Sequence, residues 1–243
     1  MEIRQILPQL YLILPTFGQV YLWREEQELT LVDSGVPGSG AEIAKAFAEL
    51  GFRRQQLRRI VLTHCHEDHA GAAAEMRGWA NVEVLVHRLD APVVRGERPY
   101  SAPMLTERER PFYENVASPT RMVPACGVDT ELADGDLIDF GGGAHVIETP
   151  GHTEGSIAIW LPENAVLFTG DLMANPNGSV ILGPFNVERS EARDSFIRLT
   201  GLPAQTICFG HGDVLTGASG AQRWSDLRED CREGSQGVPD PLG

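Results

Sequence analysis

Short apolar runs separated by turn-forming residues recur along this chain and predict a strand-rich fold. Runs of this length, bounded by Gly, Pro, Asp or Asn, are typical of strands in a buried sheet. The expected strands are residues 20–23, 29–32, 60–62, 84–86, 145–149, 157–161, 166–169 and 207–209.

Two stretches instead repeat apolar residues with the helical period. One face of residues 40–50 is apolar, and Gly51 follows as the expected stop. Ser190 is the expected N-cap of a second helix. The positions expected to face inward are Ile43, Phe47, Leu50, Ala192, Phe196 and Leu199. Because strands and helices mix in both halves, the pattern predicts an α/β fold with two similar layers of sheet flanked by helices.

Composition limits the classes of protein that this chain can represent. At 243 residues and 42% hydrophobic, it is long enough to bury a substantial core, and we expect one domain over residues 1–243. The net charge of −14 argues against general attraction to nucleic acid or to anionic lipid. A small-molecule substrate is therefore expected, with the oligomeric state open and a homodimer among the options.

The cysteines and the apolar runs favour a cytoplasmic protein. Cys65, Cys126, Cys208 and Cys231 lack C-x-x-C spacing, which predicts reduced, buried thiols rather than disulfides. The apolar stretch 6–20 is interrupted by prolines and has no small-residue cleavage site, so no signal peptide is expected. No uninterrupted apolar run is long enough to span a membrane.

The chemistry is concentrated in the hexapeptide 64–69, which has the pattern H-x-H-x-D-H directly after an expected strand. In extended chain, residues two apart face the same way, so His64 and His66 can converge on one cation. Asp68 and His69 follow where the chain should turn, and they can face another cation. Cys65 should then point into the core. The spacing predicts two metals, because four protein ligands on one ion would close a structural zinc site.

Three later strands also end in residues that commonly bind metals. His152 follows the run 145–149, Asp171 follows 166–169, and His211 follows 207–209. In α/β folds, ligands bind on loops at the carboxyl ends of strands. A glycine precedes each of the three residues, and Gly151, Gly170 and Gly210 are expected to let the backbone approach a metal closely. His87 and His145 fall outside this pattern and are interpreted as structural.

These motifs together resemble the metallo-β-lactamase-fold hydrolases, and the resemblance extends over nearly all of the chain. The residues that carry it are Asp33 in a D-x-G turn, the block from Thr63 to His69, Thr149-Pro150-Gly151-His152, Thr169-Gly170-Asp171 and Gly210-His211-Gly212. The resemblance implies a four-layer αβ/βα sandwich with two mixed sheets and a binuclear site. It implies that His64, His66 and His152 bind the first metal, that Asp68, His69 and His211 bind the second, and that Asp171 bridges them. Asp33 would then orient a ligand from outside the metal shell.

Such a site implies hydrolysis by a metal-bound hydroxide that attacks a small ester, thioester or lactone, with Asp68 and Asp171 as the catalytic residues that orient it. Nitrogen and oxygen ligands suit two Zn²⁺ ions, with iron or manganese as alternatives. The alternatives within the fold are a phosphodiesterase and an iron-dependent redox enzyme of the flavo-diiron or persulfide dioxygenase kind. A non-catalytic binding module would be expected to lack some of these ligands, and none is missing.

Substrate choice is expected to depend on residues 88–124, which depart from the alternating pattern and are rich in proline. They are interpreted as an insertion near the active site, or as a connector with one helix near 106–116. No Tyr lies between Asp171 and His211, which weakens a resemblance to quorum-signal lactonases. The charged region 223–233 predicts an exposed helix, and residues 234–243 predict a frayed terminus.

Overall fold

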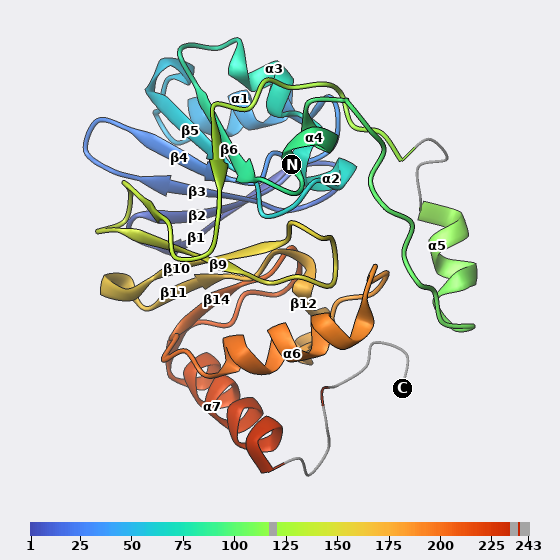
Figure 1. The fold of residues 1–243 in the computed structure, drawn as a ribbon. Coiled ribbons are helices and arrows are strands. Elements are labelled where there is room, and N and C mark those ends of the chain that lie inside the picture. Colours follow the sequence, from blue (N-terminus) through green and yellow to red (C-terminus); the bar gives the residue numbers. More distant parts are fainter. Residues whose placement is uncertain (117–120, 234–237, 239–243) are drawn as a thin grey trace. The chain divides into compact units, whose positions relative to one another are not determined.

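The computed structural model describes residues 1–116, 121–233 and 238 (Figure 1). The tail expected over 234–243 lies outside the described residues except for residue 238, and so does the part of the expected insertion at 117–120. The chain divides into two compact units, the first formed by Met1–Tyr100 with Thr120–Ala133 and the second by Ser101–Pro119 with Asp134–Gly243. The expected single domain over 1–243 stays a prediction.

The first unit is built on a seven-stranded mixed sheet with its strands in sequence order. Its strands are β1 (Glu2–Leu7), β2 (Leu10–Leu14), β3 (Val20–Arg24), β4 (Leu29–Val32), β5 (Leu57–Val61), β6 (Glu83–His87) and β7 (Thr130–Leu132). Neighbours pair antiparallel from β1 to β4 and parallel from β4 to β7. The sequence did not predict β1, β2 or β7, because β2 lies between Pro8 and Pro15 and β1 is largely polar.

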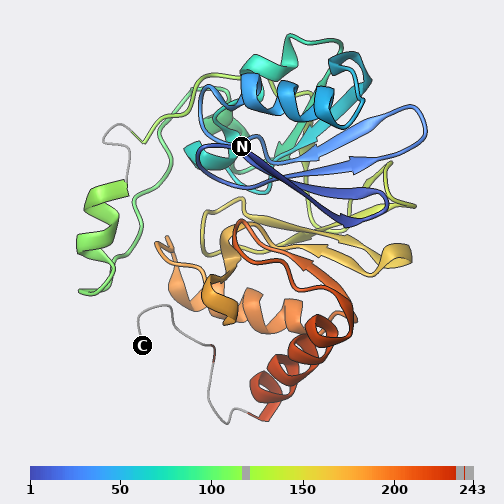
Figure 2. The same cartoon turned by 180° about the vertical axis from the view of Figure 1, so that it is seen from behind.

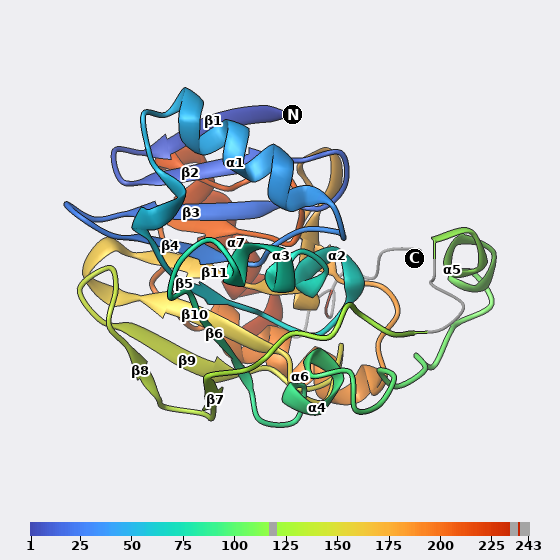
Figure 3. The same cartoon turned by 90° about the horizontal axis from the view of Figure 1, so that it is seen from above.

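Helices cover one face of this sheet, as Figure 3 shows for α1 (Ser39–Glu49) and α3 (Ala73–Arg77). Ile43 and Phe47 of α1 are buried in the core formed with the sheet, and Leu50 packs against it partly buried. Gly51 follows at a φ of 78°, which confirms the expected end of the helix. The remaining helical turns of the unit are η1 (Arg54–Gln56), α2 (Glu67–Ala70) and α4 (Ala91–Val94).

The second unit contains a five-stranded mixed sheet in the order β14-β11-β10-β9-β8 and a small sheet in the order β13-β12-β15. The strands of the larger sheet are β8 (Leu137–Ile138), β9 (Ala144–Glu148), β10 (Ile157–Leu161), β11 (Val166–Phe168) and β14 (Thr206–Cys208). Those of the smaller sheet are β12 (Met173–Asn175), β13 (Ile181–Leu182) and β15 (His211–Gly212). The short turns are η2 (Pro162–Asn164), η3 (Gly170–Leu172) and η4 (Pro176–Gly178).

The helices of this unit are α5 (Arg110–Val116), α6 (Arg189–Thr200) and α7 (Gly217–Glu233), and Figure 2 shows α6 and α7 from behind. Glu188, not Ser190, is the N-cap of α6, since its carboxylate accepts a hydrogen bond from the Ser190 N–H at 3.2 Å. The helix expected over 223–233 is present as part of α7, but it is not exposed on all sides. Trp224 and Leu227 are buried, and the indole of Trp224 donates to the Leu202 carbonyl oxygen at 3.0 Å.

The fold class predicted from the sequence is confirmed, since both units combine mixed sheets with covering helices. The small sheet around β12 is an addition that the sequence did not predict, because its strands are only two or three residues long. Among the described residues, no disulfide joins any of the cysteines. No helix in the part of the chain that the structure describes is long and apolar enough to cross a membrane.

Candidate metal centre

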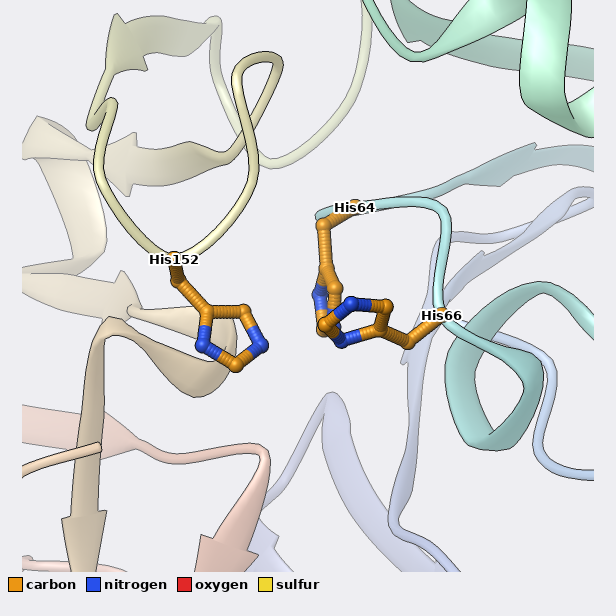
Figure 4. A group of neighbouring side chains, drawn as sticks. All are labelled: His64, His66 and His152. Atoms are coloured by element: carbon orange, nitrogen blue, oxygen red, sulfur yellow. The ribbon is translucent and has the colours of Figure 1, made fainter. Parts of the chain in front are cut away.

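The first group of expected ligands lies in the seven-stranded unit, on the loop that follows β5 and on the short helix α2. The strand ends at Val61, so the side chains of His64 and His66 come together through a loop and not through a continued strand. Their rings cross at 84° with Nε2 of His64 and Nδ1 of His66 3.1 Å apart (Figure 4). Figure 4 also shows His152, which belongs to the loop after β9 in the other unit.

The separation of these two nitrogens matches a shared cation. Two imidazole nitrogens that bind one zinc at about 2.0–2.1 Å in tetrahedral geometry lie about 3.3 Å apart. Nδ1 of His64 is 3.1 Å from Oγ1 of Thr63, so the other nitrogen of this ring is held toward His66. The position of His64 is therefore fixed from behind by a neighbour in the chain, as is usual for metal-binding histidines.

Asp33 is the buried residue that organises this loop. Its Oδ1 accepts a hydrogen bond from the Thr63 N–H at 2.7 Å, and its Oδ2 is 2.8 Å from Nδ1 of His69. Because a carboxylate only accepts, the neutral imidazole of His69 carries its proton on Nδ1 and directs the lone pair of Nε2 the other way. The φ of 65° at Asp33 is uncommon for a residue with a side chain and marks a turn that the surrounding bonds hold.

His69 and Asp68 form the second pair in this unit. Nε2 of His69 lies 3.7 Å from Oδ2 of Asp68, a distance close to that between two ligands of one cation. The carbonyl oxygen of His69 accepts hydrogen bonds from the Ser34 N–H at 2.7 Å and from its hydroxyl at 2.6 Å. The turn that begins at Asp33 thus holds both the ring and the backbone of His69.

Two further residues support this loop, and the sequence analysis did not identify them. The carboxylate of Asp90, which is fully buried, accepts a hydrogen bond from the Cys65 N–H at 2.9 Å. The ring of Tyr100 packs edge to face against His66 with 4.7 Å between ring centroids. Cys65 itself is buried in the core, as expected. An isolated Asp or Tyr carries no sequence signal of this kind, because each contact depends on the folded path of the chain.

The second group of expected ligands lies in the other unit, on three loops. His152 follows β9, Asp171 lies in η3 after β11, and His211 begins β15 just after β14. Oδ2 of Asp171 is 3.9 Å from Nε2 of His152 and 3.3 Å from Nε2 of His211. One carboxylate oxygen therefore lies near two imidazole nitrogens, an arrangement that suits a ligand shared by two cations.

Exposure varies within both groups, since Asp68 in the first and His211 in the second are more accessible than their neighbours. His64 and His69 are almost completely buried. In the second unit the side chain of Asp171 is 11% exposed and that of His211 is 39% exposed. The imidazole of His211 is thus the most accessible of these histidines within its own unit.

Gly151, which precedes the proposed ligand His152, allows close packing against a helix. The expectation from the sequence was that it allows close approach to a metal. Gly151, at a φ of 129°, faces α6, because a Cβ built on it would collide with the backbone nitrogen of Ala192. Gly170 also has a positive φ, of 52°. What Gly151 accommodates is therefore the start of a helix, and this contact fixes the loop that carries His152.

Cysteine does not contribute a ligand to the second group. Cys208 lies in β14 shortly before His211, and burial raises the pKa of its thiol well above the ordinary value. A protonated, buried thiol binds metals poorly and reacts slowly. The donors near these loops are consequently imidazole nitrogens and carboxylate oxygens.

This donor set fits divalent metal ions. Histidine and carboxylate ligands bind zinc, iron and manganese, and the choice among them is not set by donor type alone. Within each unit the ligand atoms lie at separations expected for atoms that share a cation. A cation would also offset the two carboxylates of Asp68 and Asp171.

Comparison with known proteins agrees with this chemistry. The family model for the metallo-beta-lactamase superfamily matches residues 13–211. A probable metallo-hydrolase of Bacillus subtilis is 28% identical over 218 residues, which cover 82% of this chain and 80% of the relative. A hydroxyacylglutathione hydrolase of Cereibacter sphaeroides is 34% identical over 187 residues, which cover 76% of this chain but only 57% of the relative.

Solved structures give the same result for the fold. A metallo-beta-lactamase family protein from Thermus thermophilus has a TM-score of 0.67 at 25% identity, with 94% of this chain and 81% of that chain covered. A metallo-beta-lactamase from Cronobacter sakazakii has a TM-score of 0.71 at 22% identity, with 97% and 94% covered, and shows likeness of fold alone. Because the family model spans most of the chain, this protein belongs to the metallo-beta-lactamase superfamily.

Proposed function

We propose that this chain is a binuclear metal-dependent hydrolase that acts on a small ester, thioester or lactone. The observation that carries the proposal is the placement of Asp171, whose Oδ2 lies at ligand separations from the nitrogens of both His152 and His211. A carboxylate in that position serves two cations at once, which is the arrangement of a two-metal hydrolytic centre.

In this proposal residues of both ligand groups bind the same two cations. The first cation would be held by His64, His66 and His152, and the second by Asp68, His69 and His211, with Asp171 as the ligand that both would share. Zinc is the expected metal, with iron or manganese as the alternatives. Support comes from superfamily membership and from the paired ligand atoms within each unit.

In this proposal the cations, Asp68 and Asp33 have different roles in hydrolysis. When bound, a pair of divalent cations polarises the substrate oxygen and lowers the pKa of a bound water to about 7. Asp68, whose side chain is 22% exposed, can accept a hydrogen bond from the attacking water and orient it. Asp33 holds the ring of His69, and through it the geometry on which that water depends.

The relatives favour acyl substrates. The hydroxyacylglutathione hydrolases among them act, by their name, on a thioester of glutathione. Their matched part is little more than half of their length, so we extend to this chain the reaction class and not that substrate. Ester, thioester and lactone hydrolysis share one acyl-transfer chemistry, and the donor set requires no Ser or Cys nucleophile for it.

Elemental analysis coupled to a substrate panel tests the proposal. The full chain would be purified and its metal content measured as isolated. It would then be loaded with zinc and assayed against thioesters, aryl esters, lactones, phosphodiesters and β-lactams. We expect two zinc ions per chain and turnover of at least one acyl substrate. Turnover of phosphodiesters alone, or one iron per chain with oxygen consumption, would contradict the proposal and favour the corresponding alternative.

A further inference from the structure

Residues 101–116, which include α5, are attached to the rest of the second unit by a hydrogen bond from the Met104 N–H to the Asn186 carbonyl oxygen at 2.8 Å and by one buried carboxylate. Glu109 is 1% exposed. Its Oε1 accepts hydrogen bonds from the Phe185 N–H and from Nη1 of Arg189, both at 3.1 Å, and its Oε2 accepts from the Thr106 N–H at 2.8 Å. A buried carboxylate with this many donors is costly to lose, because its partners would be left unsatisfied.

The residues to which Glu109 attaches this segment are themselves attached to the proposed ligands. In the loop 183–188, the Val187 N–H donates to the carbonyl oxygen of His152 at 3.3 Å. At the start of the same loop, a Cβ built on Gly183 would collide with the carbonyl oxygen of Asp171. The loop therefore contacts the backbone of two proposed ligands on one side and Glu109 on the other.

Phe185, in the middle of this loop, holds a strained conformation. Its φ is 65°, which is rare and energetically unfavourable for a bulky residue. The N–H of Phe185 is bonded to Glu109, and its ring packs on Phe112 and Tyr113 of α5, with ring centroids 5.3 and 5.1 Å apart. Strain of this kind persists where surrounding contacts impose it, and such places cluster at functional sites.

The segment presents apolar side chains to solvent. Met104 is 65% exposed, Phe112 is 54% exposed and Val116 is 48% exposed, and α5 has no buried residue. Figure 1 and Figure 2 show α5 beside the chain that leads into α6. On a chain with a net charge of −14, exposed apolar side chains within one short segment are candidates for a recognition surface.

We propose that Glu109 is a positioning residue that holds Met104, Phe112 and Phe185 as an apolar recognition element, and that this element selects substrates with an apolar acyl chain. The inference rests on the proposed hydrolase function and adds its substrate class. The occupant is taken to be part of the substrate, because the loop that carries Phe185 is bonded directly to the loop of His152. A buried CH₂ group is worth about fourfold in binding, so a few such contacts give a clear preference for longer chains.

The test compares p-nitrophenyl acetate, butyrate and octanoate, which share one leaving group, on the zinc-loaded full chain. We expect kcat/KM to rise from acetate to octanoate by about tenfold. F112A removes an exposed ring and so leaves folding intact, while E109Q keeps the shape of the anchor and removes its charge. Both should lower kcat/KM for octanoate about tenfold, mainly through KM, and change the value for acetate less than threefold.

Matched controls separate this effect from general damage. L137A removes an exposed apolar side chain from β8, and E107Q changes an exposed carboxylate two residues from Glu109. Both should behave as wild type on all three esters. If F112A and E109Q lower acetate and octanoate equally, or leave both unchanged, the recognition element is wrong.

A binding measurement distinguishes failure of this inference from failure of the proposed function. Octanoate, the product acid, would be titrated into wild type and F112A by calorimetry. Wild type should bind it about fivefold more tightly. If wild type hydrolyses no ester, thioester or lactone, the proposed function fails. Equal octanoate binding by wild type and F112A overturns the proposed recognition element, whatever the activity of the two proteins. A change of oligomeric state in F112A with an unchanged chain-length preference would assign this surface to a second copy of the chain and also overturn it.

Discussion

The two groups of proposed ligands are held in place by different means. In the seven-stranded unit, the ligands lie within six consecutive residues, 64–69, and the side chain of Asp33 bonds to two side chains of that loop, those of Thr63 and His69. In the second unit, three ligands come from separate loops, and the loop of His152 is held by backbone hydrogen bonds and by close packing at Gly151. One group depends on a buried carboxylate and the other on the path of the main chain.

This difference predicts different responses to mutation. A side-chain anchor is sensitive to a change of charge or hydrogen bonding that leaves the backbone intact. A backbone anchor tolerates such changes but not an added Cβ. The predictions that follow test this contrast, beginning with the carboxylate proposed as a ligand of both cations.

The largest effect is expected for Asp171→Ala. Removing a bridging carboxylate should lower metal content and reduce kcat/KM by about 1000-fold or more, since both cations lose a ligand. Metal analysis and ester turnover on the same preparation measure it. Full activity with one metal per chain would rule out the binuclear assignment.

Asp33→Asn should have the next largest effect, a loss of metal affinity at the ligands of the first group. The amide keeps the size of the side chain but loses the charge that faces His69, so metal affinity should drop about 10- to 100-fold. Calorimetric zinc titration measures it. Asp139→Asn, at an exposed position, is the control and should not differ from wild type. Equal affinities for D33N and wild type would show that this carboxylate does not orient the ligand.

Gly151→Ala tests the backbone anchor of the second group. The added Cβ would collide with the start of α6, so the free energy of unfolding should fall by about 2–4 kcal/mol. Gly135→Ala is the matched control, because Gly135 also has a positive φ but has nothing within 4 Å of the added atom. Chemical denaturation measures both. If the two variants lose the same stability, packing against α6 does not hold the loop.

The smallest effect is expected for an ion pair of the first unit that lies outside the proposed ligands. Arg77 pairs with Asp129 at 2.5 Å. Burial raises the pKa of Asp129, but the hydrogen bonds from Arg77 and the Val84 N–H and the Arg77 charge lower it more, to below the ordinary value of 3.8. The pair therefore stabilises the fold above that value, and this contribution is lost as the pH falls through the lowered pKa.

Asp129→Asn should consequently reduce the free energy of unfolding by about 1 kcal/mol or less near pH 7, because the pair is partly exposed. The difference from wild type should shrink as the pH falls below about 4. Urea unfolding at a series of pH values measures it. A difference that grows toward low pH would contradict the assigned direction of the shift.

Much of the fold was predictable from local pattern. Strands such as β4 and β10 were predicted with their observed bounds, because each is a continuous apolar run between turn residues. The edge strand β1 was missed because it is mostly polar and exposed, so its strand conformation comes from pairing with β2. The N-cap of α6 was misplaced by two residues, since Ser is a preferred N-cap by type and Glu is not.

The candidate site divides in the same way. The ligands were visible in the sequence, because His and Asp at fixed spacing after strands carry a chemical signal. The residues that support the ligand loops were not visible in the sequence. Asp90, Tyr100 and Glu109 act through contacts with residues distant in the chain. The packing around Gly151 was not visible for the same reason: the neighbour that excludes a side chain there is Ala192, which only the fold reveals.

The central claim is that both ligand groups serve one pair of cations. A crystal structure of the zinc-loaded protein, with anomalous diffraction recorded at the zinc edge, tests it most directly. We expect two peaks about 3.5–4 Å apart, each within ligand distance of side chains from both groups and both next to Asp171. A single peak, or two peaks that are each bound by residues of one group only, would contradict it.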